Sequence, residues 1–366
     1  MTVKKILIFL VGLGWLFMAC SSTSKRPQEA WNFLQELLLL HGVSGYEGEV
    51  ADYIQAKLPA GLPLQRDEMD NLWFTVGQGK PHLLFVAHTD ELGLVVTQIT
   101  EKGRLKVQGR GGFFSFMYEG YPVVIKTEKG LLEGVVEPRS DYRRFPPEEK
   151  KFGLSDFEIY LGVETRQEAE ALGVKIGDSI TIRKEVVKIG DELIYARAVD
   201  DRAGCAALLA AAWQIEWPLI EGKTITFAWD VQEEIGLRGA TRLAEKIRPD
   251  YVFPVDTFVS SAGPLDNQRF GCLPLGQGAV IRAIDSSTIS PHQAWPKVVQ
   301  IAAKKGLPLQ WGNTRGGNDG SAFMLQGAVN IPLSWPGLYS HSFIEKIHRF
   351  DLETLTNLII ALVEEF

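Results

Sequence analysis

Residues 83–93 read LLFVAHTDELG, in which five apolar residues are followed by a histidine, a threonine and two acidic residues. A short, continuous apolar run of this kind predicts a strand buried on both faces, as in a largely parallel sheet. Similar runs occur at 225–228 and 251–255. The segments between them include good helix-forming stretches at 202–215 and 240–247. We therefore predict an α/β domain built on a mostly parallel sheet.

The region from residue 95 to residue 195 has a different pattern. Runs such as 122–126 and 179–183 are rich in β-branched residues and are separated by glycine turns, which is typical of strands. Helical spacing at 31–40 and 47–57 predicts two helices ahead of it. Because helix and strand patterns resume afterwards, we interpret this β-rich region as an insertion into one α/β domain. The predicted division is a signal and tether at 1–26, α/β domain at 27–94 and 197–366, and the insert at 95–196.

The N-terminus predicts export and lipidation. Lys4 and Lys5 precede an apolar run at 6–19 that is too short to span a bilayer. The bulky Phe17 spoils an ordinary cleavage site, whereas a small residue directly before Cys20 suits bacterial lipoprotein processing. We expect Cys20 to be acylated and to anchor the protein in the bacterial cell envelope, on the periplasmic or outer-surface side. The alternative is an ordinary cleaved signal with an incidental cysteine.

Charge and cysteine content exclude some classes of partner and of fold. The net charge of -7 comes from 45 acidic and 38 basic residues spread along the chain, without a Lys/Arg block that would follow a phosphate backbone. A nucleic acid partner is therefore not expected. After Cys20 only Cys205 and Cys272 remain, so there is no disulfide framework, and we interpret both thiols as structural.

Histidine and acidic residues follow the predicted strands. His88 directly follows the first strand, Glu233 and Glu234 closely follow the second, and Asp256 directly follows the third. The carboxyl ends of strands line the ligand crevice of an open α/β sheet, so these side chains should converge. Crowded carboxylates repel one another unless a cation lies among them. The pattern therefore favours a metal site, and histidine with carboxylate ligands suits zinc, cobalt or manganese.

Each candidate has a simpler interpretation when taken alone. His88 could be a hydrogen-bonded histidine at the edge of the core, although Asp90 points the same way in an extended chain and could accept its second imidazole N–H. Asp200 and Asp201 could merely cap the helix that follows them. His341 comes after the apolar run at 329–333, at a plausible strand end, but by itself it would be a surface-loop histidine. The residues alone leave these alternatives open.

Taken together, seven stretches resemble the M42 family of metalloaminopeptidases, which includes the glutamyl and deblocking aminopeptidases. The resemblance covers nearly the whole mature chain, in matching order and spacing. The stretches are SGYEGEV at Ser44, AHTDELG at Ala87, VDDRAG at Val199, QEEIGLRGA at Gln232, VDT at 255–257, GGNDGSA at Gly316 and YSHS at Tyr339.

The resemblance implies two divalent metal ions, expected to be zinc, with cobalt or manganese as alternatives. The implied ligands are His88, Asp200, Glu234, Asp256 and His341. Asp200 would bridge the ions, sharing one with His88 and Asp256 and the other with Glu234 and His341. Glu233 falls on the family's general base and Asp90 on the carboxylate that orients the first histidine. A cis peptide bond between Asp200 and Asp201 is implied as well.

The implied fold is a zinc-peptidase α/β catalytic domain interrupted by a small β-barrel-like insert. The implied reaction is hydrolysis of the N-terminal bond of peptides, by a metal-activated water from which Glu233 removes a proton. Leu338 and the GGNDG stretch depart from the family pattern, which leaves substrate preference and assembly open. Family members often form hollow tetrahedral dodecamers, and here we carry over no more than a homo-oligomer. Two alternatives are a β-glucan hydrolase and an inactive envelope binding lipoprotein.

Overall fold

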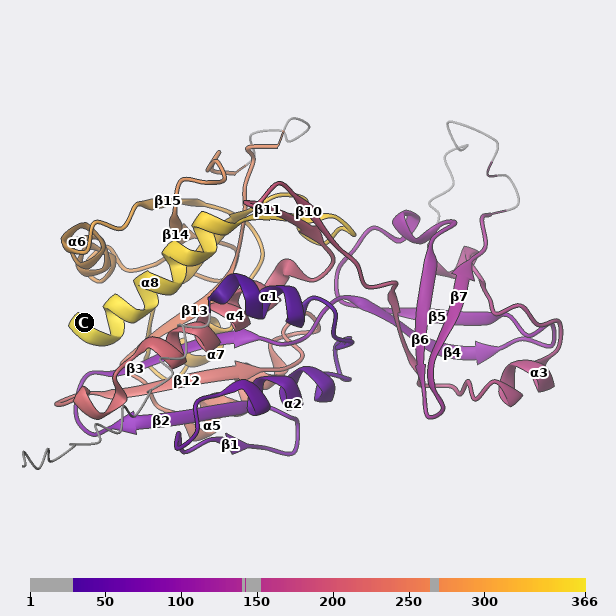
Figure 1. Ribbon diagram of the computed structural model, residues 1–366, viewed down its shortest axis with the longest axis horizontal. Helices are drawn as coiled ribbons and strands as arrows, with labels where there is room; N and C mark the ends of the chain where they lie inside the picture. Colours follow the sequence, from indigo (N-terminus) through magenta and orange to yellow (C-terminus); the bar gives the residue numbers. More distant parts are fainter. Residues whose placement is uncertain (1–28, 140–141, 143–152, 264–269) are drawn as a thin grey trace, which may run out of the picture.

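The computed structural model describes residues 29–139, 142, 153–263 and 270–366. The predicted signal and tether, with Cys20, lie outside the described residues. Within the described part of the chain, no helix has both the length and the apolar character needed to cross a membrane. Figure 1 shows two bodies side by side, a larger one of helices around a sheet and a smaller one made mainly of strands.

A nine-stranded sheet forms the centre of the larger body. In sheet order the strands are β1 (Gln65–Arg66), β2 (Leu72–Gly77), β12 (Thr224–Asp230), β3 (His82–His88), β13 (Tyr251–Val259), β17 (Leu333–Gly337), β14 (Ala279–Ile284) and β15 (Leu309–Asn313), and β16 (Val329–Asn330) pairs with β13. The central strands β12, β3, β13 and β17 are mutually parallel. β2 and β14 run antiparallel to their neighbours β12 and β17. The sheet is thus mixed with a parallel centre, and the predicted α/β class is confirmed.

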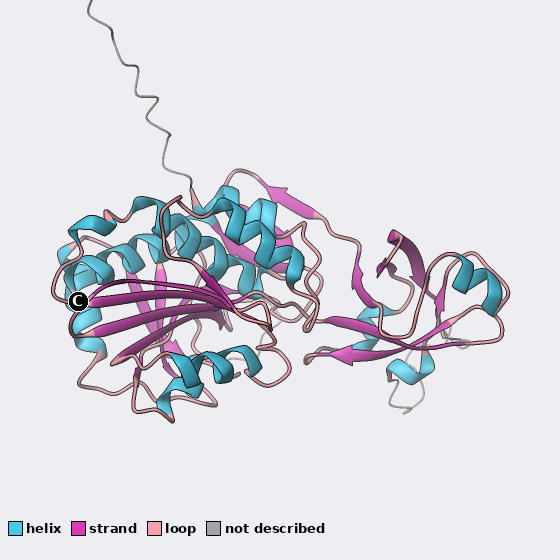
Figure 2. Ribbon diagram, turned by 90° about the horizontal axis from the view of Figure 1, so that it is seen from below, coloured by secondary structure: helices cyan, strands magenta, loops and turns pink. Residues whose placement is uncertain are grey.

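Both faces of the sheet are covered by helices, as Figure 2 shows. One core joins the sheet to α1 (Ala30–Leu37), α2 (Gly48–Lys57), α4 (Val199–Gln214), α6 (Trp295–Lys304) and α8 (Arg349–Glu365). A second core joins the opposite face to α5 (Arg238–Lys246) and α7 (Gly320–Met324). The predicted helices correspond to α1, α2, α4 and α5, although α1 ends at Leu37 rather than at residue 40. A short 3-10 helix, η3 (Trp217–Leu219), follows α4.

The continuous apolar run in β3 is explained by these two layers. Successive side chains of a strand point to opposite faces. Leu83, Phe85 and Ala87 accordingly belong to the first core, and Leu84 and Val86 to the second. All five are completely buried. The strand ends at His88, so the polar stretch that follows begins at its carboxyl end.

Two candidate residues occupy positions that differ from the expectation. Asp256 lies within β13, which continues to Val259, and not after the strand. The continuation is favoured because the residues that follow are aromatic or β-branched and Phe258 is buried. The apolar run at 329–333 is divided between β16 and β17, so His341 follows β17 instead.

The smaller body is a closed barrel with its own core. Around the barrel its strands are β4 (Gly93–Ile99), β5 (Leu105–Arg110), β8 (Ile159–Tyr160), β7 (Gly130–Val136), β6 (Pro122–Thr127) and β9 (Ser179–Ile182). The barrel region also carries α3 (Arg166–Ala171) and the 3-10 helices η1 (Ser115–Tyr118) and η2 (Leu154–Asp156). The expectation of a β-barrel-like insert is therefore confirmed.

The end of the predicted insert does not belong to the barrel. β10 (Val186–Ile189) and β11 (Leu193–Ala196) form a three-stranded sheet with β18 (Glu345–His348), a strand close to the C-terminus. The barrel strands thus run from residue 93 to residue 182. The remainder of the predicted segment, up to residue 196, pairs with the second part of the α/β domain.

A buried charge cluster lies where the chain passes from the sheet into the barrel. Glu91 is completely buried and accepts a hydrogen bond of 3.1 Å from the backbone N–H of Gly42. It forms an ion pair with Lys184, and its carboxylate lies 3.7 Å from Arg202 and 3.9 Å from Arg197. Burial alone would raise the pKa of Glu91, but these cations lower it to about 2. Glu91 lies just before the barrel, and Lys184 and Arg197 come after it. The Glu91 carboxylate thus connects both ends of the barrel segment to Arg202 in α4.

We expect Glu91→Gln to lower the free energy of unfolding by about 3 to 5 kcal/mol, because removing one partner leaves buried cations uncompensated. Urea unfolding followed by circular dichroism measures the change. Glu101→Gln is the control, since Glu101 pairs with Arg166 at 2.8 Å on the surface and such pairs contribute little. If Glu91→Gln lowers the free energy of unfolding no more than this control does, Glu91 does not stabilise the junction through its ion pairs.

Candidate active site

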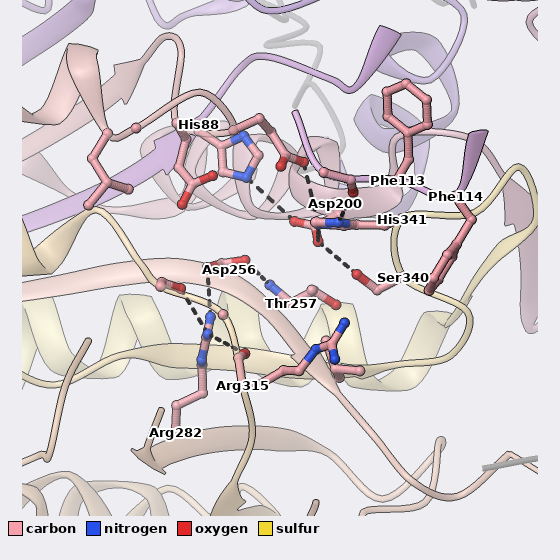
Figure 3. Close-up of a pocket in the computed structure, with 18 residues that line it drawn as sticks. His88, Phe113, Phe114, Asp200, Asp256, Thr257, Arg282, Arg315, Ser340 and His341 are labelled. Carbon is pink, nitrogen blue, oxygen red and sulfur yellow. Dashed lines mark hydrogen bonds and ion pairs between the residues drawn. The ribbon is translucent and has the colours of Figure 1, made fainter. Parts of the chain in front are cut away.

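A pocket of about 620 Å³ opens at the carboxyl ends of the central strands. All five predicted metal ligands and Glu233 line it, together with Phe113 and Phe114 from the segment after β5 of the barrel. Figure 3 shows His88, Asp200, Asp256 and His341 directed toward one another in this pocket. Asp90 does not line the pocket but lies buried behind it. The structure therefore brings the predicted residues together.

The first predicted ligand group is His88, Asp200 and Asp256. One potential ligand atom from each lies within 4.8 Å of the other two. His88 Nε2 is 3.4 Å from Asp200 Oδ1. Among the described residues, Asp200 Oδ1 has no hydrogen-bond partner although it is buried. A buried carboxylate oxygen without a partner is costly, so this position fits a cation held between the three side chains.

The second predicted ligand group is Asp200, Glu234 and His341. His341 Nε2 lies 3.6 Å from Glu234 Oε1 and 3.8 Å from Asp200 Oδ2. His341 Nδ1 lies 2.6 Å from the carbonyl oxygen of Gly112, which can only accept a hydrogen bond. Nδ1 therefore carries a proton, which leaves Nε2, the nitrogen that faces the two carboxylates, available to a metal ion. The barrel segment thus fixes the tautomer that a metal ligand requires.

Asp90 lies behind the pocket and contacts three of the residues that surround it. Its Oδ1 lies 3.4 Å from His88 Nδ1, as expected of a carboxylate that orients a histidine ligand. Its oxygens also accept hydrogen bonds from the backbone N–H groups of Glu233 at 2.9 Å and Glu234 at 3.2 Å, and from the Ser44 hydroxyl at 2.6 Å. The contact of Asp90 with His88 was expected, whereas its contact with the Glu233–Glu234 backbone was missed by sequence reasoning.

Asp200 and Asp201 divide the two roles that the sequence left open. Neither has helical backbone angles, although both lie in the first turn of α4. Asp201 accepts hydrogen bonds from the backbone N–H groups of Gly204 at 2.9 Å and His88 at 3.1 Å. Asp201 therefore caps the helix, while the Asp200 side chain is free to enter the pocket. The peptide bond between them is cis, as the resemblance implied.

The electrostatics of the site also fit bound cations. Burial raises the pKa of Glu233 and Glu234, and nearby carboxylates add to the effect. Burial likewise raises the pKa of Asp256 to about 6. Burial alone would lower the pKa of His88, but Asp200 and Asp90 raise it well above the usual value. Without bound cations, these crowded carboxylates repel one another, and positive ions in the pocket would offset that repulsion.

Arg282 was not among the predicted residues, although it contacts one of them. It is buried, donates a 2.6 Å hydrogen bond to Asp256 Oδ2 and lies 3.3 Å from Asp285. The backbone N–H of Thr257 donates to Asp256 Oδ1 at 2.6 Å. Asp256 is therefore held from two sides. An arginine within the apolar run of β14 was the only signal of this contact in the sequence.

Two polar residues near α4 were also missed. Ser340 Oγ donates to Asp200 Oδ2 at 3.1 Å, and it lies within the YSHS stretch (Figure 3). Glu345 contacts the backbone of both Asp200 and His341. No sequence pattern pointed to Glu345, because its contacts depend on how the loop after β17 folds back.

Comparisons with known proteins agree with this geometry. Residues 71–358 match the family model described as M42 glutamyl aminopeptidase. The chain is 31% identical over 334 residues to the putative aminopeptidase FrvX of Escherichia coli, covering 89% of this chain and 92% of that protein.

Solved structures with the same architecture include two informative cases. The TET1 peptidase of Pyrococcus horikoshii, which can assemble into a tetrahedron or a large octahedral shell, has a TM-score of 0.85 and 35% identity, over 92% of this chain and all 100% of that one. A Thermotoga maritima protein described as an endoglucanase has a TM-score of 0.74 and 27% identity, over 91% of this chain and 96% of that one.

Proposed function

Because the chain belongs to the M42 glutamyl aminopeptidase family, we propose that it is a dinuclear metal-dependent aminopeptidase that hydrolyses the N-terminal bond of peptides. The observation that carries the proposal is the convergence of two histidines and three carboxylates on one pocket. The residues that would hold the ions are His88, Asp200, Glu234, Asp256 and His341. Their nitrogen and oxygen donors suit zinc, with cobalt and manganese as alternatives.

When bound, the two ions would lower the pKa of a water molecule and stabilise negative charge on the peptide carbonyl oxygen. The residues of this chain supply the rest. Glu233 lines the pocket, and Asp90 holds its backbone. The raised pKa of Glu233, caused first by burial, suits a group that takes a proton from water and returns it to the leaving amine. The acidic lining would attract the free amino terminus of a peptide.

The proposal is tested with an aminoacyl 4-nitroanilide and its N-acetylated counterpart, in the metal-loaded and the metal-stripped protein. We expect hydrolysis of the free-amine substrate, loss of activity on chelation, recovery with zinc, cobalt or manganese, and little activity on the blocked substrate. Equal rates on the free and blocked substrates would contradict an exopeptidase.

The two alternative functions have less support. Glycoside hydrolysis needs a pair of carboxylates but no histidine ligands, whereas both histidines here face the carboxylates. An inactive binding lipoprotein would have no need for a complete ligand set with Glu233. Activity on carboxymethylcellulose in place of the aminoacyl amide would favour the glucanase. Absence of both activities in the metal-loaded protein would favour the inactive form.

We also propose that Cys20 is lipidated and anchors the enzyme in the bacterial cell envelope. Two or three acyl chains hold a protein at a membrane far more firmly than one. Cys20→Ser should therefore lose labelled palmitate and leave the membrane fraction. If the wild-type protein does not incorporate palmitate, the N-terminus is an ordinary cleaved signal.

The assembly is proposed to be a homo-oligomer, since the similar TET1 peptidase forms multisubunit shells. A lipid-anchored N-terminus restricts how subunits could pack into a closed shell. Mass measurement of the detergent-solubilised protein by light scattering tests the proposal, and a monomeric mass at assay concentration would contradict it.

A further inference from the structure

A single buried carboxylate joins the backbone of the loop that carries His341 to the start of α4. Glu345 is the first residue of β18, and only 4% of its surface is exposed. Its Oε1 accepts a hydrogen bond of 2.8 Å from the backbone N–H of His341. Its Oε2 accepts one of 3.1 Å from the backbone N–H of Asp200. One side chain thus connects the backbones of two predicted ligands that come from separate parts of the fold.

The conformation of this loop explains why such a contact is needed. Tyr339 has φ of 62° and His341 has φ of 63°, both in the left-handed region. Non-glycine residues in this region cost about 1 to 3 kcal/mol each and persist only where the surroundings enforce them. Backbone hydrogen bonds of 3.2 and 2.9 Å between Leu338 and Lys346 close the base of the loop. Glu345 supplies the constraint at the position of the histidine itself.

The contacts of Glu345 distinguish the second ligand group from the first. His88 lies beside Asp90, and Asp256 is held by Arg282 and the backbone of Thr257. These anchors do not involve Glu345, which contacts the first group only through the backbone of Asp200. In the second group, by contrast, the backbone of His341 depends on Glu345. Loss of Glu345 should therefore affect the second group more than the first.

Glu345 is not placed as a ligand. Both of its oxygens accept backbone N–H groups, and it is absent from the lining of the main pocket. We propose that Glu345 is a positioning residue that sets His341 and Asp200 for the second metal ion. The inference rests on the proposed dinuclear function. It adds a residue outside the ligand set on which the affinity for one of the two ions depends.

Metal-stripped protein is titrated with Zn²⁺ in a calorimeter. A parallel titration with Co²⁺ is monitored by visible absorption. We expect two equivalents in the wild type. Glu345→Gln keeps the shape of the side chain but replaces one acceptor oxygen with an NH₂ group. We expect this variant to bind the second equivalent about 10- to 100-fold more weakly, as is typical when a group supporting a ligand is lost. Affinity for the first equivalent should change much less.

Asp351→Asn is the matched control. Asp351 is also a buried carboxylate that accepts two backbone N–H groups, from Gly276 and Gly278, each at 2.7 Å. It does not line the main pocket. The control should lose stability without losing affinity for either equivalent. If Asp351→Asn weakened the second equivalent as much as Glu345→Gln, the effect would be one of general stability and the proposal would be wrong.

Glu345→Asp provides a second variant, because it keeps the charge while its shorter side chain cannot reach both N–H groups. Circular dichroism identifies which variants are folded. Two tightly bound equivalents in either folded variant would overturn the positioning role while leaving the dinuclear function intact. A wild type that binds no metal would instead overturn the proposed function and, with it, this inference.

Discussion

Glu233→Gln should lower kcat by about 10²- to 10⁴-fold, the range that a general acid-base group contributes, while the protein keeps its fold and both metal ions. An amide has nearly the same shape as the carboxylate but cannot accept and return a proton. The backbone N–H of Glu233 donates to Asp90, and this contact does not depend on the side chain. The variant should therefore retain the shape of the pocket.

Metal content and turnover of an aminoacyl 4-nitroanilide must be measured on the same preparation. The neighbouring substitution Glu234→Gln is the comparison, since Glu234 lies 3.6 Å from His341 and is proposed as a ligand. It should lower the metal content, which Glu233→Gln should not. Loss of metal from Glu233→Gln would contradict the assignment of this residue as the base.

Asp200→Ala should lower both the metal content and the activity, because it removes the only side chain shared by the two ligand groups. Asp200 Oδ1 faces His88 at 3.4 Å and Oδ2 faces His341 at 3.8 Å. Each ion would therefore lose a ligand at once. Elemental analysis of the purified variant, dialysed against a fixed zinc concentration, measures the loss.

The control for this variant is Asp52→Ala, which removes a carboxylate that pairs with Arg66 at the surface. It should keep the metal content of the wild type. An Asp200→Ala protein that still binds two equivalents of zinc would refute the bridging role of Asp200.

The central sheet could be predicted from the sequence because its signals are local. The apolar run before His88 required burial on both faces, and helices on both faces of β3 supply it. The alternating pattern of residues 179–183 likewise predicted a strand, which the barrel contains. Family membership was predicted from motifs spread along the chain, and the match over residues 71–358 confirms it.

The supporting contacts could not be predicted because they join residues far apart in the chain. Gly112 fixes the tautomer of His341 only because the barrel packs beside the loop after β17. Arg282 reaches Asp256 across the sheet, and Glu345 reaches two backbones through a folded-back loop. None of these contacts follows from residue type or spacing. The sequence indicated the candidate ligands, and tertiary packing decides which contacts hold them.

The central claim, that this pocket holds two ions bridged by Asp200, is tested most directly by anomalous diffraction from zinc-loaded crystals at the zinc absorption edge. We predict two peaks, one between His88, Asp200 and Asp256 and the other between Asp200, Glu234 and His341. A single peak, or none, in this pocket at saturating zinc would contradict the account.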